Sequence, residues 1–209
     1  MKTTAITKEV QNGLTPTSVI ADLLEGNKRF VDAENEAVDH LAQVKHTIDG
    51  QFPKAVILSC IDSRVPVELL FDQGVGDVFV ARVAGNFVNV DMLGSIEYSC
   101  KVAGSKIVLV LGHESCGAVK AACDGVELGN ITEMLSKIKP AVALASKEVS
   151  GEKNSSNKEF VNKTIVHNVQ LTIDRIRKES PILKEMEDNG EIQIVGGVYS
   201  LTTGKVEML

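Results

Sequence analysis

The sequence predicts an α/β fold with a mainly parallel central sheet, a C-terminal edge strand, flanking helices and an N-terminal helical arm. Three short, continuous apolar runs carry this prediction, at residues 54–59, 77–81 and 106–111. Runs of this length are typical of strands that are buried on both faces of a parallel sheet. Helical patterns lie between the runs, and such alternation indicates parallel strands joined by right-handed crossovers.

A helical arm is predicted ahead of the first strand. Thr15-Pro16, followed by spaced apolar residues as far as Phe30, predicts an amphipathic helix with Thr15 as N-cap and Pro16 at the first helical position. A weaker helical pattern runs from about His40 to Asp49. The apolar stripe of the first helix needs a partner surface, because it would otherwise face water.

The segments between and after the strands are predicted to be mostly helical. A short helix is expected to start at Pro66, and a longer stretch covers residues 93–102. Three further helical segments are expected, at 116–123, 131–149 and 159–179.

The tail predicts a final strand and a hairpin. Its two strand patterns lie at residues 192–195 and 205–208, and they are expected to extend the edge of the sheet. No composition shift marks a second domain. One domain is therefore expected over residues 1–209, with a helical arm (1–50), an α/β core (51–123), a helical segment (124–190) and a C-terminal strand and hairpin (191–209).

Charge and composition exclude several classes of protein. The net charge is −6 and no Lys/Arg cluster forms a basic stripe, so nucleic acid is not an expected partner. The polar start lacks a signal-peptide pattern and no segment reaches the ~18 apolar residues of a membrane span, which predicts a cytoplasmic protein without a membrane partner. Four cysteines do not make a disulfide scaffold, and in a reducing compartment they stay available to a metal.

Two short motifs combine residues that bind zinc. Cys60 follows the first predicted strand and His113 nearly follows the third, at the carboxyl ends where open α/β sheets bind ligands. Cys116 lies three residues after His113, which predicts both side chains on one side of an emerging helical turn. A structural zinc site closes with four ligands, whereas a catalytic one keeps three and a water. Cys60, His113 and Cys116 therefore predict a working zinc site in the α/β core.

Asp62 and Arg64 lie beside the first ligand and have two alternative roles. Two thiolates cancel the formal charge of Zn²⁺, so water on the metal should be less acidic than in an all-His site, where its pKa is about 7. Asp62 could accept a hydrogen bond from zinc-bound hydroxide while Arg64 holds the carboxylate in a charge-assisted pair. Alternatively, Asp62 could bind zinc as a fourth ligand and close the site.

The other thiols and imidazoles lack ligand spacing. Cys100 and Cys123 lie in helix-like apolar patterns, where a free cysteine fills core space. His40, His46 and His167 have no thiol at a useful spacing, which favours surface or packing positions.

The combined motifs resemble those of the β-class carbonic anhydrases. The similarity covers nearly the whole chain, from the Leu14 region to Tyr199. It is carried by Cys60-x-Asp62-x-Arg64, Ala84-Gly85-Asn86, Ser95-Ile96-Glu97-Tyr98 and Gly112-His113-x-x-Cys116-Gly117.

The resemblance implies an enzyme that hydrates carbon dioxide reversibly to bicarbonate and a proton. It implies one Zn²⁺ per subunit, attack on CO₂ by zinc-bound hydroxide, and Asp62-Arg64 as the supporting dyad. It also implies pocket roles for the Gly117 amide and for Tyr98. Gln73 is the nearest match to a glutamine that the adjoining subunit supplies, although the ungapped alignment is one residue out.

The resemblance further implies a homodimer, or a homotetramer built as a dimer of dimers, in which N-terminal helices embrace a neighbour. One departure from the family pattern is Arg82-Val83, where many relatives have Arg-Asn, so different local hydrogen bonding is expected there.

Two other functions fit the same residues. A carbonyl sulfide or carbon disulfide hydrolase would keep the same zinc ligands, because pocket shape and access determine the substrate. A non-catalytic zinc- or thiol-binding protein would need no open metal position and would make little use of Asp62.

Overall fold

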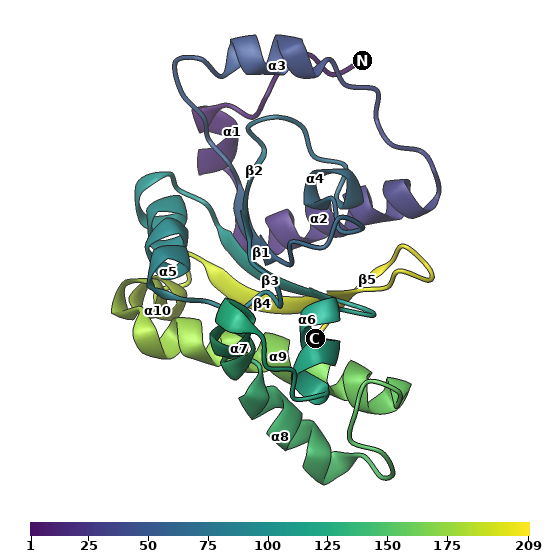
Figure 1. Cartoon of the computed structure of the whole chain (residues 1–209). Coiled ribbons are helices and arrows are strands. Elements are labelled where there is room, and N and C mark those ends of the chain that lie inside the picture. The colour runs from purple at the N-terminus through teal and green to yellow at the C-terminus, as the bar shows by residue number, and fades with distance from the viewer.

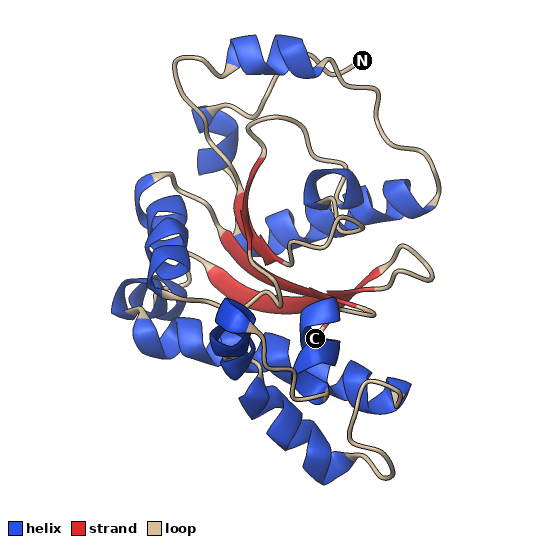
Figure 2. Cartoon of the chain, in the orientation of Figure 1, coloured by secondary structure: helices blue, strands red, loops and turns tan.

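A five-stranded sheet forms the centre of the computed structural model, which describes residues 1–209 (Figures 1 and 2). The strand order is β2-β1-β3-β4-β5, and only the last pair is antiparallel. The predicted mainly parallel sheet with a C-terminal edge strand is confirmed. The strands are β1 (Ala55–Ser59), β2 (Val78–Arg82), β3 (Ile107–His113), β4 (Gln193–Tyr199) and β5 (Val206–Met208).

Helices cover both faces of the sheet (Figure 1). They are α1 (Lys8–Asn12), α2 (Pro16–Val31), α3 (His40–His46), α4 (Val67–Leu70), α5 (Val90–Glu97), η1 (Tyr98–Val102), α6 (Gly117–Cys123), α7 (Gly129–Ser136), α8 (Lys139–Glu148), α9 (Lys158–Glu179) and α10 (Pro181–Asp188). None of them combines the length and the apolar character that crossing a membrane requires.

The two faces of the central strands pack against different helices. Alternate side chains of a strand point to opposite faces, so Val56 and Leu58 enter one apolar core while Ala55 and Ile57 enter another. The first core includes residues of α5, α9 and α10, and the second includes residues of α2 and α4. β1 and β3 are buried along their whole length, as their continuous apolar runs predict.

Several helix predictions need correction. The predicted helix 131–149 is two helices, α7 and α8, and Pro140 occupies the first turn of α8. Proline is favoured at a helix start because it lacks the N–H that an interior position would need. The helix predicted from His40 to Asp49 ends at His46, the 93–102 stretch begins at Val90 and ends as η1, and α1 and α10 were not predicted.

The predicted N-cap of α2 is confirmed, and part of the apolar stripe of this helix packs against other residues of the same chain. Thr15 Oγ1 accepts the Ser18 N–H at 3.2 Å, and Ser18 Oγ accepts the Thr15 N–H at 2.9 Å. This reciprocal pair is a capping box. Val19 and Leu23 are buried in the core of the second sheet face, so the apolar stripe of α2 is covered in part by the sheet itself.

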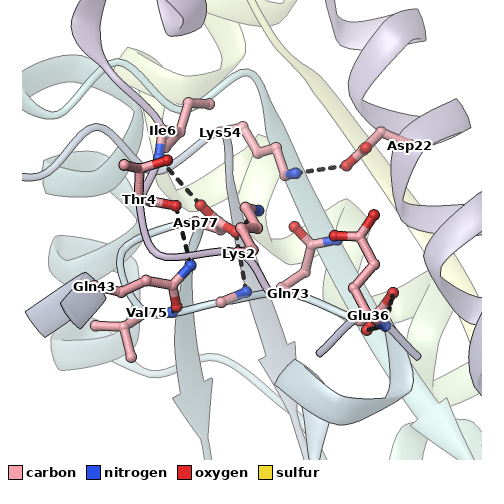
Figure 3. Close-up of polar contacts among 12 residues, drawn as sticks. Lys2, Thr4, Ile6, Asp22, Glu36, Gln43, Lys54, Gln73, Val75 and Asp77 are labelled. Carbon is pink, nitrogen blue, oxygen red and sulfur yellow. Dashed lines mark hydrogen bonds and ion pairs between the residues drawn. The ribbon is translucent and has the colours of Figure 1, made fainter. Parts of the chain in front are cut away.

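A buried carboxylate fastens the start of the chain to the amino end of β2. Asp77 directly precedes β2 and is 1% exposed. Its Oδ2 accepts from Lys2 Nζ at 2.8 Å and from the Gly74 N–H at 3.0 Å, and its Oδ1 accepts from the Ile6 N–H at 3.3 Å (Figure 3). Both carboxylate oxygens are therefore paired.

Gln43 of α3 ties the same two segments together. It is fully buried, its amide nitrogen donates to the Thr4 carbonyl at 3.1 Å, and its amide oxygen accepts from the Val75 N–H at 3.0 Å (Figure 3). We call this set the Asp77 cluster; it comprises Lys2, Thr4, Ile6, Gln43, Gly74, Val75 and Asp77.

Candidate metal centre

Three buried side chains meet at the carboxyl ends of two neighbouring strands. Cys60 directly follows β1, His113 is the last residue of β3, and Cys116 is the N-cap of α6. Because β1 and β3 are paired in parallel as far as Ser59 and Leu111, their ends lie side by side. The potential ligand atoms of the three side chains all lie within 4.8 Å of one another, and the two sulfur atoms are 3.9 Å apart.

The segment from His113 to Cys116 is a tight turn and not the predicted helical turn. His113 belongs to the strand, and Ser115 adopts the left-handed conformation with φ of 56°. This conformation is uncommon for a residue other than glycine and indicates a constrained turn. Across this turn, the Cys116 thiol lies within 4.8 Å of the imidazole nitrogen.

His113 presents one nitrogen that fits a metal. Its Nδ1 lies 2.8 Å from the Glu114 carbonyl oxygen, so Nδ1 carries the proton and donates it there. The other nitrogen, Nε2, is buried and has no hydrogen-bond partner. Buried nitrogen atoms without a partner are rare, and metal-bound histidines characteristically make this second bond to a carbonyl. Two thiols and one imidazole suit zinc.

A hydrogen bond between the two thiols shifts their pKa values in opposite directions. The hydrogen bond from Cys116 lowers the pKa of Cys60, although burial opposes this shift. The same bond raises the pKa of Cys116, and burial raises it further. The Gly85 N–H also lies 3.4 Å from the Cys60 sulfur and stabilises a thiolate there. One thiolate is therefore favoured, and a cation would remove the cost of ionising the second.

Asp62 is paired with Arg64 beside the three side chains. Arg64 Nε donates to Oδ1 at 2.9 Å and Nη2 donates to Oδ2 at 2.8 Å, and the Arg64 backbone N–H also donates to Oδ1 at 2.9 Å. These hydrogen bonds hold the pKa of Asp62 well below its usual range. Asp62 Oδ2 lies 4.0 Å from the unpaired Nε2 of His113, so the carboxylate borders the position that a metal would take.

Comparison with known proteins places this centre in a family. The family model described as carbonic anhydrase matches residues 55–206. The chain belongs to the carbonic anhydrase family. A protein named carbonic anhydrase 2 from Mycobacterium tuberculosis is 34% identical over 199 residues, which cover 91% of each chain. The carbonic anhydrase of Mycolicibacterium smegmatis is 32% identical and the match covers 92% of this chain and 93% of that one.

Solved structures identify the class as β. A Coccomyxa β-carbonic anhydrase in complex with acetazolamide is 26% identical, with a TM-score of 0.72 and coverage of 91% of this chain and 86% of that chain. Tetrameric β-carbonic anhydrases from Sordaria macrospora share the fold with a TM-score of 0.73 at 22% identity, over 92% of this chain and 97% of that chain. The predicted β-class carbonic anhydrase fold is confirmed.

Arg82 also supports the centre of this carbonic anhydrase, a role that no sequence motif indicates. It ends β2, opposite Ser59 in the parallel register. Its Nε donates to the Cys60 carbonyl at 2.8 Å, and its Nη2 donates to the Asp62 carbonyl at 2.6 Å. The side chain therefore fixes the backbone that carries one ligand and the carboxylate. The sequence feature that could have indicated this role is an arginine at the carboxyl end of β2, the strand that pairs with the one before Cys60.

The structure places the three predicted pocket residues in different surroundings. Gly117 directly follows Cys116 as the first residue of α6, and the space around its Cα is open. Tyr98 is half exposed and lines an open cavity of about 760 Å³ together with Phe79 and Met92; none of the three metal-site residues lines it.

Gln73 lies near the amino end of β2, whereas Cys60 lies at the carboxyl end of the paired strand β1. Its amide nitrogen donates to the Phe71 carbonyl at 2.6 Å, while its buried amide oxygen has no partner. Within one chain, the structure does not bring Gln73 to the metal centre.

The remaining thiols and histidines take other positions. Cys100 is buried in the core on the α5, α9 and α10 side, and Cys123 lies 3.7 Å from Thr164 Oγ1. His167 Nε2 lies 2.9 Å from a Glu148 carboxylate oxygen, and His40 and His46 begin and end α3. None of these belongs to the group of three.

Proposed function

We propose that this protein catalyses the reversible hydration of carbon dioxide at one zinc ion held by Cys60, His113 and Cys116. The observation that carries the proposal is the buried, unpartnered Nε2 of His113 in a group with two thiols. Membership of the carbonic anhydrase family supports the reaction. Zinc bound there would supply a Lewis acid that lowers the pKa of water, to a smaller extent than in an all-His site because two of the ligands are thiolates.

Asp62 would orient the reacting water by accepting a hydrogen bond. It is suited to this because it remains an anion across the physiological range, owing to its bonds with Arg64. Arg64 uses two donors and its backbone N–H on one carboxylate, which restricts the carboxylate to one orientation. Arg82 restrains the same loop from the other side through the carbonyls of Cys60 and Asp62. The Asp62 and Arg64 pair would thus act as a dyad that orients water.

We also propose that the protein works as a homodimer or as a dimer of dimers. Leu41 and Val44 are exposed on the same side of α3, three residues apart, and Ile48 is exposed two residues beyond its end. The cavity beside Tyr98 is apolar and open, and the Gln73 amide oxygen lacks a partner within the chain. In such an assembly, Gln73 of the adjoining subunit would join Tyr98 and Gly117 in the substrate pocket. Sedimentation of the zinc-loaded protein tests this, and a monomer at micromolar concentration would contradict it.

Stopped-flow measurement of the zinc-loaded protein tests the reaction directly. We expect carbon dioxide hydration far above the buffer rate, with one zinc per chain by elemental analysis. Carbonyl sulfide and carbon disulfide are assayed in parallel, because the same ligands could serve a hydrolase. Turnover of carbon dioxide no better than buffer at every pH would overturn the proposal, and faster turnover of either sulfur compound would reassign the substrate.

A further inference from the structure

The carboxylate of Glu114 is bound to the loop that joins β4 to β5. Glu114 lies between two of the proposed zinc ligands, His113 and Cys116. Its Oε2 accepts hydrogen bonds from Ser200 Oγ at 3.0 Å, from the Thr202 N–H at 3.2 Å and from Thr202 Oγ1 at 3.1 Å. Three donors on one oxygen make a strong attachment, because bonds to an ionised acceptor are stronger than neutral ones.

Ser200 organises the loop that provides these donors. Its Oγ also accepts the N–H groups of Thr202 and Thr203, each at 3.2 Å. Its own backbone N–H donates to the Lys205 carbonyl at 2.8 Å, which closes the loop. The donors that face Glu114 are therefore held in place before the carboxylate binds them.

The loop is also fastened to helix α2. Asn27 is 4% exposed, its amide nitrogen donates to the Gly204 carbonyl at 3.0 Å, and its amide oxygen accepts from the Val206 N–H at 2.8 Å. The hairpin loop thus forms a fixed support, anchored both to the sheet and to the helical arm.

The backbone of Glu114 is hydrogen-bonded both to Tyr199 and to the imidazole of His113. The Glu114 N–H donates to the Tyr199 carbonyl at 2.9 Å, and the Glu114 carbonyl accepts from His113 Nδ1 at 2.8 Å. That second bond determines which nitrogen of His113 carries the proton and how the ring is turned. The next residue, Ser115, holds the left-handed conformation, so the turn needs surrounding contacts to persist.

We propose that Glu114 is a positioning residue for the metal centre. Its carboxylate, clamped by Ser200 and Thr202, fixes the carbonyl that orients His113 and presents Nε2 to zinc. This inference rests on the proposed zinc site. Glu114 has no contact with substrate in this role, and it acts only through the histidine.

Metal affinity and cobalt absorption test the inference without measuring turnover. Zinc affinity is measured by competition with a chromophoric chelator, and ligand geometry by the visible spectrum of the cobalt(II)-substituted protein. For Glu114→Ala we expect about tenfold weaker zinc binding and altered cobalt bands. Loss of a group that orients a metal ligand typically weakens metal binding by about 10–100-fold, and this variant should lie at the lower end of that range. A wild-type protein that binds zinc but fails to hydrate carbon dioxide would overturn the function and leave this inference standing.

Matched variants separate the clamp from a general effect of charge or folding. Glu127→Ala removes an exposed carboxylate that makes no side-chain hydrogen bond or ion pair, and should leave zinc affinity and the cobalt spectrum unchanged. Thr202→Val removes one donor from the opposite side and should weaken zinc binding about threefold, as part of the same clamp. The double variant Glu114→Ala with Thr202→Val should bind zinc about as weakly as Glu114→Ala alone, because both changes break one contact.

Folding of each variant is checked by circular dichroism. A folded Glu114→Ala protein with zinc affinity within twofold of wild type and an unchanged cobalt spectrum overturns the inference, and so does strict additivity in the double variant. If Glu114→Ala does not fold, Thr202→Val decides alone: weaker zinc binding with altered cobalt bands supports the clamp, and wild-type values overturn it.

Discussion

The two ends of the parallel strands β1, β2 and β3 bury polar groups that differ in their hydrogen bonding. At the amino end, both oxygens of the Asp77 carboxylate have hydrogen-bond partners. At the carboxyl end, His113 has one nitrogen bonded to a carbonyl and the other left without a partner. The complete bonds of the Asp77 carboxylate stabilise the fold, whereas the free Nε2 of His113, grouped with two thiols, is available to a metal.

The two ends also differ in how far apart their partners lie in the sequence. Asp62 and Arg64 are two residues apart, so their pairing requires little beyond a local turn. Lys2 and Asp77 are 75 residues apart, so their pairing requires the whole arm to be folded against the sheet. Disrupting the first end should change chemistry with little loss of stability, and disrupting the second should do the reverse.

The largest effect is expected from Cys60→Ser at the carboxyl end. A serine hydroxyl is a poor replacement for a thiolate on zinc, so the variant should lose its metal and its carbon dioxide hydration should fall to the buffer rate. Elemental analysis and stopped-flow assay measure both. The matched control is Cys100→Ser, a buried thiol in the core on the α5 side, which should keep its zinc and lose only about 1–3 kcal/mol of stability. A Cys60→Ser protein with full zinc and a wild-type rate would contradict the ligand assignment.

Asp62→Asn should reduce the rate at the same end without releasing the metal. An amide carries no charge for Arg64 to pair with and accepts a weaker hydrogen bond, so kcat should fall by about 10–100-fold while zinc content is retained. Stopped-flow assay at neutral pH measures the rate. Asp49→Asn alters an exposed carboxylate after α3 and should leave the rate unchanged. Full activity in Asp62→Asn would remove the dyad from the mechanism while leaving the zinc site intact.

Asp77→Asn should lower stability at the amino end and leave the rate of each folded molecule near wild type. Losing the charge weakens the bonds from Lys2, Gly74 and Ile6, which should reduce the free energy of unfolding by about 1–3 kcal/mol. Urea denaturation measures this, again with Asp49→Asn as the control. Equal stability of Asp77→Asn and wild type at pH 7 would mean that the cluster contributes nothing.

The same stabilisation should depend on pH in a defined direction. Burial by itself raises the pKa of Asp77, but the hydrogen bonds from Lys2 and the Gly74 N–H outweigh it, so the pKa is lowered in the folded protein. The unfolded chain then binds more protons, and stability rises with pH. The difference in free energy of unfolding between wild type and Asp77→Asn should have its full size above the ordinary pKa of 3.8. It should shrink as the pH falls through the pKa of Asp77 in the folded protein. A difference that grows in acid would contradict this sign.

The smallest effect is expected from Thr15→Ala in the arm. The change removes the side-chain cap of α2 and should reduce stability by about 1 kcal/mol. Thermal or urea unfolding measures it. Thr17→Ala, two residues later on an exposed position of the same helix, should be neutral or slightly stabilising because alanine favours helix. Equal losses for both variants would show that the cap is not the cause.

The features that were predicted correctly depend on residues close together in the chain. The apolar runs of β1 and β3 and the Thr15 cap each lie within a few residues. The meeting of Cys60 and His113 follows from parallel topology, which brings strand ends together. The helical turn predicted between His113 and Cys116 was wrong, because spacing alone cannot distinguish a helix from a tight turn with Ser115 in the left-handed conformation.

The sequence by itself determined that β1 and β3 are buried, that the sheet is mainly parallel, the family, and which three residues form the candidate metal centre. These follow from local patterns of hydrophobicity and of metal-binding side chains. The tertiary structure alone decided what supports them. The bonds of Arg82 to the Cys60 loop, of Thr202 to Glu114 and of Lys2 to Asp77 all join residues 20 or more positions apart. Hydrogen bonds of this kind depend on distance and direction in space, and a linear pattern carries neither.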